Sequence, residues 1–255
     1  MKEIVLVTFL FIYNFSYAQK LHRKYYKNGQ LKAIGKYQNW KKGVSKTFSF
    51  SSDDGFESID GERTDEWKFY HENGQLESIG KYQNNKKTDK WKLYHKNGQL
   101  ESIGKYENGE KIGEWKFYRE NGKLSNIQKY KNRKLVELKE YYENNQLEEV
   151  IEYNKNGEFS SIREYYKNGQ LKHEINYDEN GEISGEWKIY YDNGQLMVIA
   201  KYHNDKFIDI ISYFDNKGNK LYKGTIKNGN GTVNHYDETG RLIKIITYIN
   251  GEIKE

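Results

Sequence analysis

The chain has 255 residues, of which 35% are hydrophobic and 16% aromatic, and its formal charge is +5. It has three alanines and no cysteine, so it lacks the best helix former and cannot build disulfides or cysteine-based zinc and redox sites. The 42 basic and 37 acidic residues are interleaved rather than clustered, which argues against a nucleic-acid partner. Low net charge with many aromatics predicts a folded chain, but one without a single deep core.

Residues 1–18 differ in composition from the remainder of the chain. A basic Lys2 precedes an apolar run from Ile4 to Phe15, and Ser16-Tyr17-Ala18 then places small residues before Gln19. This is the pattern of a secretory signal peptide, because the apolar run is shorter than the roughly 20 residues of a membrane span. We therefore expect cleavage near Ala18-Gln19 and an exported mature protein, periplasmic, at the cell surface or secreted, without a membrane span. An uncleaved anchor and a buried strand are the alternatives.

An internal repeat of about 24 residues occupies the rest of the sequence, in about ten units. Its turns carry Asn-Gly pairs at Asn28 and Gly29, Asn73 and Gly74, Asn97 and Gly98, Asn121 and Gly122, Asn168 and Gly169, and Asn193 and Gly194. Asn-Gly between alternating aromatic runs predicts a two-residue type I′ turn, in which both central residues have positive φ. One copy has Asn145 in place of the glycine, and asparagine is the residue that best tolerates that conformation.

Each unit consists of two predicted strands and two turns. A second turn follows each hairpin, for example at residues 82–84, so consecutive units form an antiparallel meander. If Asn73-Gly74 is a two-residue turn, Trp67 faces Gly80 and His71 faces Leu76. A small residue opposite the tryptophan, which is Gly80, Gly104 or Ala200 in three of the units, leaves room for the indole to cover it.

Both faces of the predicted sheet carry some apolar residues, and neither is dense. The pattern therefore predicts an all-β fold, in which tandem hairpins form an elongated, twisted antiparallel meander sheet rather than a closed sandwich. Partial coiling into a solenoid stays open. Residues 19–255 are expected to form one repeat domain that is degenerate at 45–66 and 205–255, with a bulge or loop in the first of these segments.

The repeated motif resembles a known family. Trp-Lys-x-Tyr-x-x-Asn-Gly-Gln-Leu, then Tyr-x-Asn-Gly and Gly-Glu-Trp, is similar to the bacterial variant of the MORN repeat, and residues 236–242 also resemble the Tyr-Asp repeat of bacterial surface proteins. The resemblance implies a hairpin solenoid or single-layer sheet without catalytic machinery. Related bacterial proteins are often labelled antitoxins, and eukaryotic MORN proteins are associated with scaffolding near membranes. The signal sequence argues against a cytoplasmic antitoxin.

No catalytic constellation is recognisable in the sequence. His71 and His95 share a repeat position that Tyr26, Arg119 and Tyr142 fill in other units, and such a permissive position indicates packing rather than catalysis or metal binding. Phosphate-loop, nucleophile-elbow and zinc motifs are absent from the sequence. We expect no catalytic residue, no metal and no cofactor.

The candidate binding residues are the repeated aromatics. They are Trp67, Tyr70, Trp91, Tyr94, Trp115, Tyr118, Trp187 and Tyr190. Either they pack on one another as the thin core of the sheet, or they form a stacking surface for a glycan or a protein partner, since aromatics are enriched in interface cores.

The resulting expectation is an exported, non-enzymatic repeat protein that acts as a binding or scaffold module for a protein or cell-envelope partner. The alternative is an antitoxin-like or immunity-like protein that neutralises a toxin. A more remote alternative is a glycan-binding or carbohydrate-active protein. Neither nucleic acid nor a membrane span is expected, and a homodimer through a sheet face or edge is a further option.

Overall fold

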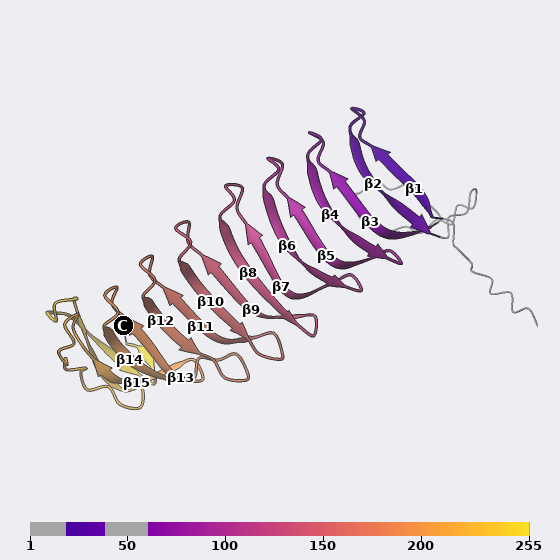
Figure 1. Ribbon diagram of the computed structural model, residues 1–255. Helices are drawn as coiled ribbons and strands as arrows, with labels where there is room; N and C mark the ends of the chain where they lie inside the picture. The colour runs from indigo at the N-terminus through magenta and orange to yellow at the C-terminus, as the bar shows by residue number, and fades with distance from the viewer. Residues whose placement is uncertain (1–18, 39–60, 255) are drawn as a thin grey trace, which may run out of the picture.

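A computed structural model describes residues 19–38 and 61–254 of the chain. The predicted signal sequence and most of the irregular segment 45–66 lie outside these residues. The described residues form a long sheet of fifteen strands in sequence order and a small sheet of three (Figure 1). Every neighbouring pair is antiparallel, as β1–β2 and β16–β17 illustrate, so the prediction of an all-β meander of tandem hairpins is confirmed. Within these ranges, no helix is long and apolar enough to span a membrane.

The long sheet runs through β1 (Lys20–Tyr25), β2 (Leu31–Gln38), β3 (Glu62–Tyr70), β4 (Leu76–Gln83), β5 (Lys86–Tyr94), β6 (Leu100–Glu107), β7 (Glu110–Tyr118), β8 (Leu124–Lys131), β9 (Lys134–Tyr141), β10 (Leu147–Tyr153), β11 (Phe159–Tyr165), β12 (Leu171–Asn176), β13 (Gly185–Tyr190), β14 (Leu196–His203) and β15 (Lys206–Tyr213). The small sheet contains β16 (Gly231–Tyr236), β17 (Leu242–Ile249) and β18 (Glu252–Ile253).

The Asn-Gly loops differ from the prediction. In the β3–β4 hairpin, the amide of Gly74 donates to the carbonyl of His71 at 2.9 Å, and the amide of His71 donates to the carbonyl of Gln75 at 2.8 Å. Only Gly74 has a positive φ, of 85°, so the loop has three residues and ends in a left-handed glycine. The two-residue type I′ prediction is therefore wrong here. Asn73 acts through its side chain, because its Oδ1 accepts from the amide of Gln75 at 3.0 Å.

Turns with two positive φ values occur at the opposite end of the hairpins. Asn84 and Asn85 have φ of 51° and 64°, and Asn108 and Gly109 have 52° and 90°, as a type I′ turn requires. That end is mixed, because residues 154–158 and 178–182 form three-residue loops of the first kind, with Gly157 and Gly181 in the left-handed region. At Asn145 the prediction is confirmed, since its φ is 65°.

The predicted register holds although the loop is one residue longer. Trp67 pairs with Gly80, as expected, but Leu76 pairs with Tyr70 rather than with His71. A bulge after Phe69 absorbs the extra loop residue and restores the register beyond it. Because side chains alternate, the bulge keeps the apolar set of each strand on its intended face.

The long sheet has two faces that we name by their side chains. The Trp face carries Trp67, Trp91 and Trp115 together with their aromatic neighbours. The Ile face carries an alternating row in which the pairs Lys68–Ile79 and Lys116–Ile127 lie across adjacent strands. Over most of its length the sheet is a single layer (Figure 1).

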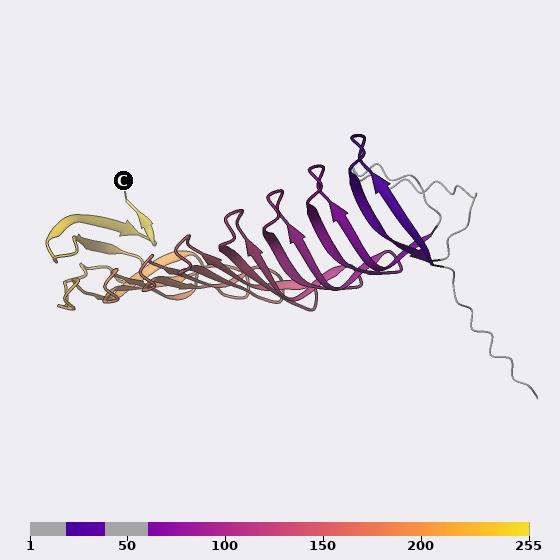
Figure 2. The same ribbon diagram turned by 45° about the horizontal axis from the view of Figure 1, so that its top comes forward.

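The C-terminal end of the molecule has two layers. After β15 the chain leaves the meander, and the small sheet stands over that end of the long sheet (Figure 2). Ile226 and Val233 pack there against Val198, Ala200 and Phe207 in a buried cluster. Since Trp187 pairs with Ala200, the small sheet covers the Trp face of the last strands. In this degenerate segment, the repeat therefore supplies a cap instead of extending the long sheet.

Candidate binding surface

Three of the predicted binding tryptophans lie in the interior of the sheet. Trp67 and Trp91 are 0% exposed and Trp115 is 1% exposed, so a ligand cannot stack on these rings. Their environment is aromatic: Tyr82 meets Trp91 edge-to-face with ring centroids 5.1 Å apart, and Phe69 lies 5.8 Å from Trp67. Of the two interpretations of these rings, burial supports packing.

Each buried indole covers a glycine on the strand before it. A Cβ atom on Gly80 would overlap with the indole of Trp91, and the indole N–H donates to the carbonyl of Lys81 at 3.1 Å. The same contacts join Trp67 to Gly35 and Trp115 to Gly104. The expectation that Trp67 covers Gly80, the residue opposite it, is therefore wrong, because the glycine that each indole covers lies on the preceding hairpin. Each tryptophan therefore joins two consecutive units.

Trp187 has a different environment. By the β12–β13 register, Ile175 occupies the place of the covered glycine, and the buried Nε1 of Trp187 has no hydrogen-bond partner in the described part of the chain. Instead, Trp187 packs against the core beneath the small sheet. It is a core residue of the cap rather than a joint between units.

The four predicted tyrosines lie on the Ile face. Tyr70, Tyr94, Tyr118 and Tyr190 pair with leucines on the following strands and are half-buried. Tryptophans and tyrosines therefore do not form one surface, because each tyrosine lies three positions after its tryptophan and successive residues alternate between faces.

A row of cations lies on the Trp face above the aromatic rings. Arg63, Lys87 and Lys111 occupy the same position in β3, β5 and β7. The Nζ of Lys87 is 4.4 Å from the ring centroid of Trp91, and that of Lys111 is 4.8 Å from Trp115. Arg63 lies over Trp67 at 5.3 Å and donates to the Tyr82 hydroxyl at 3.2 Å. We call these three residues the cation row. Attraction between cation and ring quadrupole holds them over the rings.

Both lysines of the cation row are partly desolvated. Burial lowers the pKa of Lys87, and the nearby charge of Arg63 lowers it further. Burial also lowers the pKa of Lys111. Within residues 19–38 and 61–254, neither ammonium group has an ion pair or a hydrogen bond, and both lie over aromatic rings. The carboxylate of Glu77 offsets part of the lowering of the Lys87 pKa.

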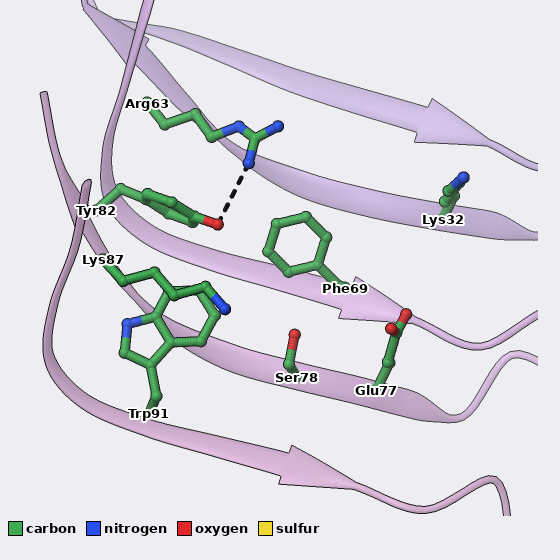
Figure 3. A pocket seen from close by; sticks show the side chains of 8 residues that line it. All are labelled: Lys32, Arg63, Phe69, Glu77, Ser78, Tyr82, Lys87 and Trp91. Atoms are coloured by element: carbon green, nitrogen blue, oxygen red, sulfur yellow. Dashed lines mark hydrogen bonds between the residues drawn. The ribbon is translucent and has the colours of Figure 1, made fainter. Parts of the chain in front are cut away.

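Two members of the cation row, Arg63 and Lys87, line a shallow pocket of about 190 Å³ (Figure 3). Arg63, Lys87, Tyr82 and Trp91 form one end of it, and the exposed carboxylate of Glu77 stands at the other. The lining is completed by Lys32, Phe69 and Ser78. The pocket therefore combines an aromatic floor with a positive end.

The position shared by His71 and His95 is a ladder of donors between hairpins. In every case the side chain reaches a backbone carbonyl of the next hairpin at 2.7–3.0 Å. The donors are Tyr26, His71, His95, Arg119, Tyr142, Tyr166 and Tyr191. The position thus requires a long hydrogen-bond donor and not a particular residue type. A second ladder accompanies it, in which Asn73 Nδ2 donates to the carbonyl of Lys96 at 2.8 Å.

The middle of the Trp face is acidic. Glu140 pairs with Glu149, and Glu149 pairs with Glu164, on three adjacent strands. Burial and the neighbouring carboxylates raise the pKa of Glu149. The carboxylate of Glu164 has two close partners, Lys172 Nζ at 2.7 Å from its Oε1 and His173 Nε2 at 2.6 Å from its Oε2. Among the described residues, no group of three or more His, Asp or Glu side chains is placed to hold a metal ion.

These features define the class of the protein. It is a tandem-hairpin repeat sheet whose units are joined by indole–glycine contacts and donor ladders, and whose faces offer contact surface. The family model described as MORN repeat variant matches residues 19–39, 66–84, 90–108, 111–132, 135–155, 162–179, 183–204 and 230–250. The chain therefore belongs to the MORN repeat variant family, whose repeats suggest a binding module.

The other comparisons are distant. The search of curated proteins returns no match. Among solved structures, the chain is similar to "Crystal Structure of TcdB2-TccC3-TEV", with 12% identity, a TM-score of 0.18 and coverage of 89% of this chain and 14% of that one. It is also similar to "Crystal Structure of TcdB2-TccC3 without hypervariable C-terminal region", with 11% identity, a TM-score of 0.16 and coverage of 87% and 14%. The chain thus spans about one seventh of the length of either structure.

Proposed function

We propose that this protein is an exported, non-enzymatic binding module whose hairpin array holds a protein or cell-envelope partner. The observation that carries the proposal is the open, single-layer sheet, in which most of both faces is not covered by a second layer (Figure 2). In a repeat array each unit packs only against its neighbours in the chain, so the array is elongated. Its faces therefore form an extended surface that can bind a partner. The side chains on these faces supply hydrogen bonds, charge and apolar contact.

The partner is tested by chemical cross-linking in the host that encodes the chain, with excess purified residues 19–255 as a competitor. We expect one or a few cross-linked species that the competitor removes. Recovery of the chain only in uncross-linked form would contradict the binding role. A captured toxin whose activity is neutralised would support the antitoxin alternative, and turnover of a captured glycan would contradict the non-enzymatic part.

Export rests on the pattern of residues 1–18 and is compatible with a sequence that has no cysteine. The test compares the full chain with a chain that begins at Gln19, by cell fractionation and intact mass. We expect the full chain to reach the envelope or medium with Gln19 as its first residue. A full chain that stays in the cytoplasm and retains Met1 would overturn the export proposal and leave the binding proposal to be tested separately.

A further inference from the structure

The most regular feature of the Ile face is a pair of side-chain rows. Every odd-numbered strand from β3 to β13 ends in a tyrosine, and the residue two positions earlier is a lysine or an arginine. The tyrosines form the Tyr row, which is Tyr70, Tyr94, Tyr118, Tyr141, Tyr165 and Tyr190. The basic residues form the Lys row, which is Lys68, Lys92, Lys116, Lys139, Arg163 and Lys188. Residues two positions apart in a strand share a face, so both rows cross the sheet on the Ile face.

Packing within the sheet does not account for this regularity. The residue between each basic residue and its tyrosine lies on the Trp face and differs from strand to strand. It is Phe69, Leu93, Phe117, Glu140, Glu164 or Ile189. The Tyr row is half-buried, and within the described residues its hydroxyls form no hydrogen bond. Phenylalanine would therefore pack equally well, and the repeated hydroxyl is available to a ligand.

We propose that the Tyr row and the Lys row bind an extended, anionic β-1,4-linked polysaccharide of the cell envelope, with one carboxylate per disaccharide. This inference rests on the proposed binding function and names the partner class. The polysaccharide crosses the strands at right angles. One sugar of each disaccharide stacks on a ring of the Tyr row and exchanges hydrogen bonds with its hydroxyl, and the carboxylate reaches the Lys row.

The spacing of the rows selects this polymer. Successive members of a row lie two strands apart, which amounts to about 9.6 Å. In an extended β-1,4-linked chain each sugar is turned over relative to the one before, so the same ring face recurs once per disaccharide, at an interval close to this one. A leucine lies between successive tyrosines, since Leu100 pairs with Tyr94 and Leu124 pairs with Tyr118. Tyrosine and leucine thus suit alternate sugars.

Hydrogen bonds between hairpins hold the Tyr row at this interval. His71 Nε2 is 2.8 Å from the carbonyl oxygen of Tyr94, and His95 Nε2 is 2.8 Å from that of Tyr118. The other side chains of the donor ladder reach the remaining members of the Tyr row in the same way. The surface is therefore ordered before the ligand arrives, which lowers the entropy cost of binding.

The charge of this face complements a polymer of carboxylates. Beside the middle of the rows, Lys90, Lys105 and Lys129 outnumber Asp89 and Glu114. Several members of the Lys row contact a glutamate of their own strand at 3.1–3.5 Å. These pairs are partly exposed, and exposed ion pairs contribute little to stability. A carboxylate of the ligand can therefore take the place of the glutamate.

The Ile face is also accessible to a long ligand. The small sheet lies on the Trp face, and among the described residues no second layer covers the Ile face of β3–β13 (Figure 2). The sheet twists along its length, as antiparallel sheets do. A thin, flexible chain follows rows that twist in this way, whereas a flat membrane surface would contact only part of them.

The test measures binding of the full chain to biotinylated, sparsely substituted carboxymethyl-cellulose by biolayer interferometry. This probe has a β-1,4-linked backbone and carries carboxylates. We expect saturable binding that weakens as salt rises. Hydroxyethyl-cellulose has the same backbone without charge and should bind at least ~5-fold more weakly, because it lacks the charge-assisted hydrogen bonds.

Three double variants separate ring, hydroxyl and charge. Tyr94→Leu with Tyr118→Leu removes two rings, and the affinity should fall at least ~10-fold. Tyr94→Phe with Tyr118→Phe removes only hydroxyls without a partner, so the melting temperature should stay unchanged while the affinity falls about 3-fold. Lys92→Gln with Lys116→Gln should weaken binding at least ~5-fold and reduce its dependence on salt.

The matched control is Phe117→Leu. Phe117 lies between Lys116 and Tyr118 but packs on the Trp face, and Leu93 occupies the same place in β5. The affinity of this variant for carboxymethyl-cellulose should remain within about 2-fold of wild type. Circular dichroism and thermal melts of all variants check that the proteins stay folded.

Four results would overturn the inference. They are equal binding of hydroxyethyl-cellulose, equal binding of the α-linked polygalacturonate, unchanged affinity of the Tyr94→Phe and Tyr118→Phe variant, and tighter binding of an acidic peptide or a single-stranded oligonucleotide of equal charge. If no polysaccharide binds while cross-linking still captures a protein in cells, this inference fails and the proposed function stands.

Discussion

The hairpins from β3 to β8 and the hairpins after β12 bury their tryptophans in different ways. In the first group, Trp91 covers Gly80 and donates to the carbonyl of Lys81, and the sheet remains a single layer. In the second, Trp187 lies beside Ile175, its indole N–H has no acceptor among the described residues, and the small sheet covers it. An indole laid flat over a glycine thus stands in for a second layer. Where Ile175 takes the place of the glycine, the small sheet supplies a real second layer, whereas β9–β12 have neither the indole–glycine contact nor a second layer.

The largest difference between the two regions is expected on removal of the indole. Trp91→Ala deletes a fully buried side chain together with its hydrogen bond and should lower the free energy of unfolding by about 3–5 kcal/mol. Trp187→Ala removes a half-buried ring whose N–H has no partner in the described part of the chain, so we expect a smaller loss. Urea denaturation of both variants measures the difference. Equal losses would show that the glycine contact contributes nothing specific.

Substitution of the glycine under the indole should have the next largest effect on the free energy of unfolding. Gly104→Ala places a methyl group against the indole of Trp115 and should cost about 1–3 kcal/mol through overpacking. Gln128→Ala is the matched control, because Gln128 occupies the equivalent place one unit later, where no tryptophan follows. We expect it to cost about 0.5–1.5 kcal/mol in the same urea experiment, because Gln128 loses its hydrogen bonds with Tyr130 and Asn126 but meets no indole. A neutral Gly104→Ala would mean that the indole can move aside at no cost.

The architecture was predictable because periodicity and turn chemistry act locally. The 24-residue repeat and the alternation of faces gave the meander and the pairing of Trp67 with Gly80. The loop type was not predictable, because Asn-Gly fits both a two-residue turn and the end of a three-residue loop. The bulge that reconciles loop and register depends on both strands at once. The folding back of the last hairpin depends on long-range packing of Ile226 and Val233.

The candidate site was less accessible to sequence reasoning. The repeated aromatic residues were identified from the sequence, but Trp91 is fully buried whereas Tyr94 is only half-buried. A count of aromatic residues does not reveal this difference in burial. The cation row was missed although Arg63, Lys87 and Lys111 recur at 24-residue intervals. Superposing the repeat units position by position would have revealed it. Its contact with the rings follows only from the structure.

Substitutions in the loops test backbone strain alone, because the loop glycines do not lie under an indole. Gly98→Val places a β-branched residue at a φ of 83° and beside the side-chain amide of Gln75, so we expect a cost of about 1–3 kcal/mol. Asn145→Gly should be neutral or slightly stabilising, because Asn145 already has a φ of 65° and glycine relaxes it. Thermal melts measure both changes. An unchanged melting temperature for Gly98→Val would contradict the left-handed loop position.

The donor ladder, which runs through both regions, should show a smaller effect. Tyr142→Phe removes only the hydroxyl that donates to the carbonyl of Tyr165 at 2.8 Å, and should cost about 0.5–1.5 kcal/mol. Tyr141→Phe is the control on the adjacent residue, since the hydroxyl of Tyr141 has no recorded partner within the described ranges. If urea denaturation gives equal effects for the two variants, the ladder does not contribute to stability.

The smallest effect concerns Glu149, in the region without indole–glycine contacts. Burial and the charges of Glu140, Glu164 and Glu148 raise its pKa, so the folded state holds the proton more tightly than the unfolded state does. Ionisation therefore opposes folding: the stability is fully present below the unfolded value near 4.5 and declines as pH rises through the raised pKa. Glu149→Gln keeps the shape and removes the charge, and at pH 7 it should stabilise the protein by less than ~1 kcal/mol because the site is partly solvated. Urea denaturation of wild type and variant at pH 4 and pH 7 measures this, and the advantage of the variant should shrink at pH 4. A variant that is less stable than wild type at pH 7 would show that the Glu149 carboxylate makes a favourable contact that outweighs the repulsion along its row.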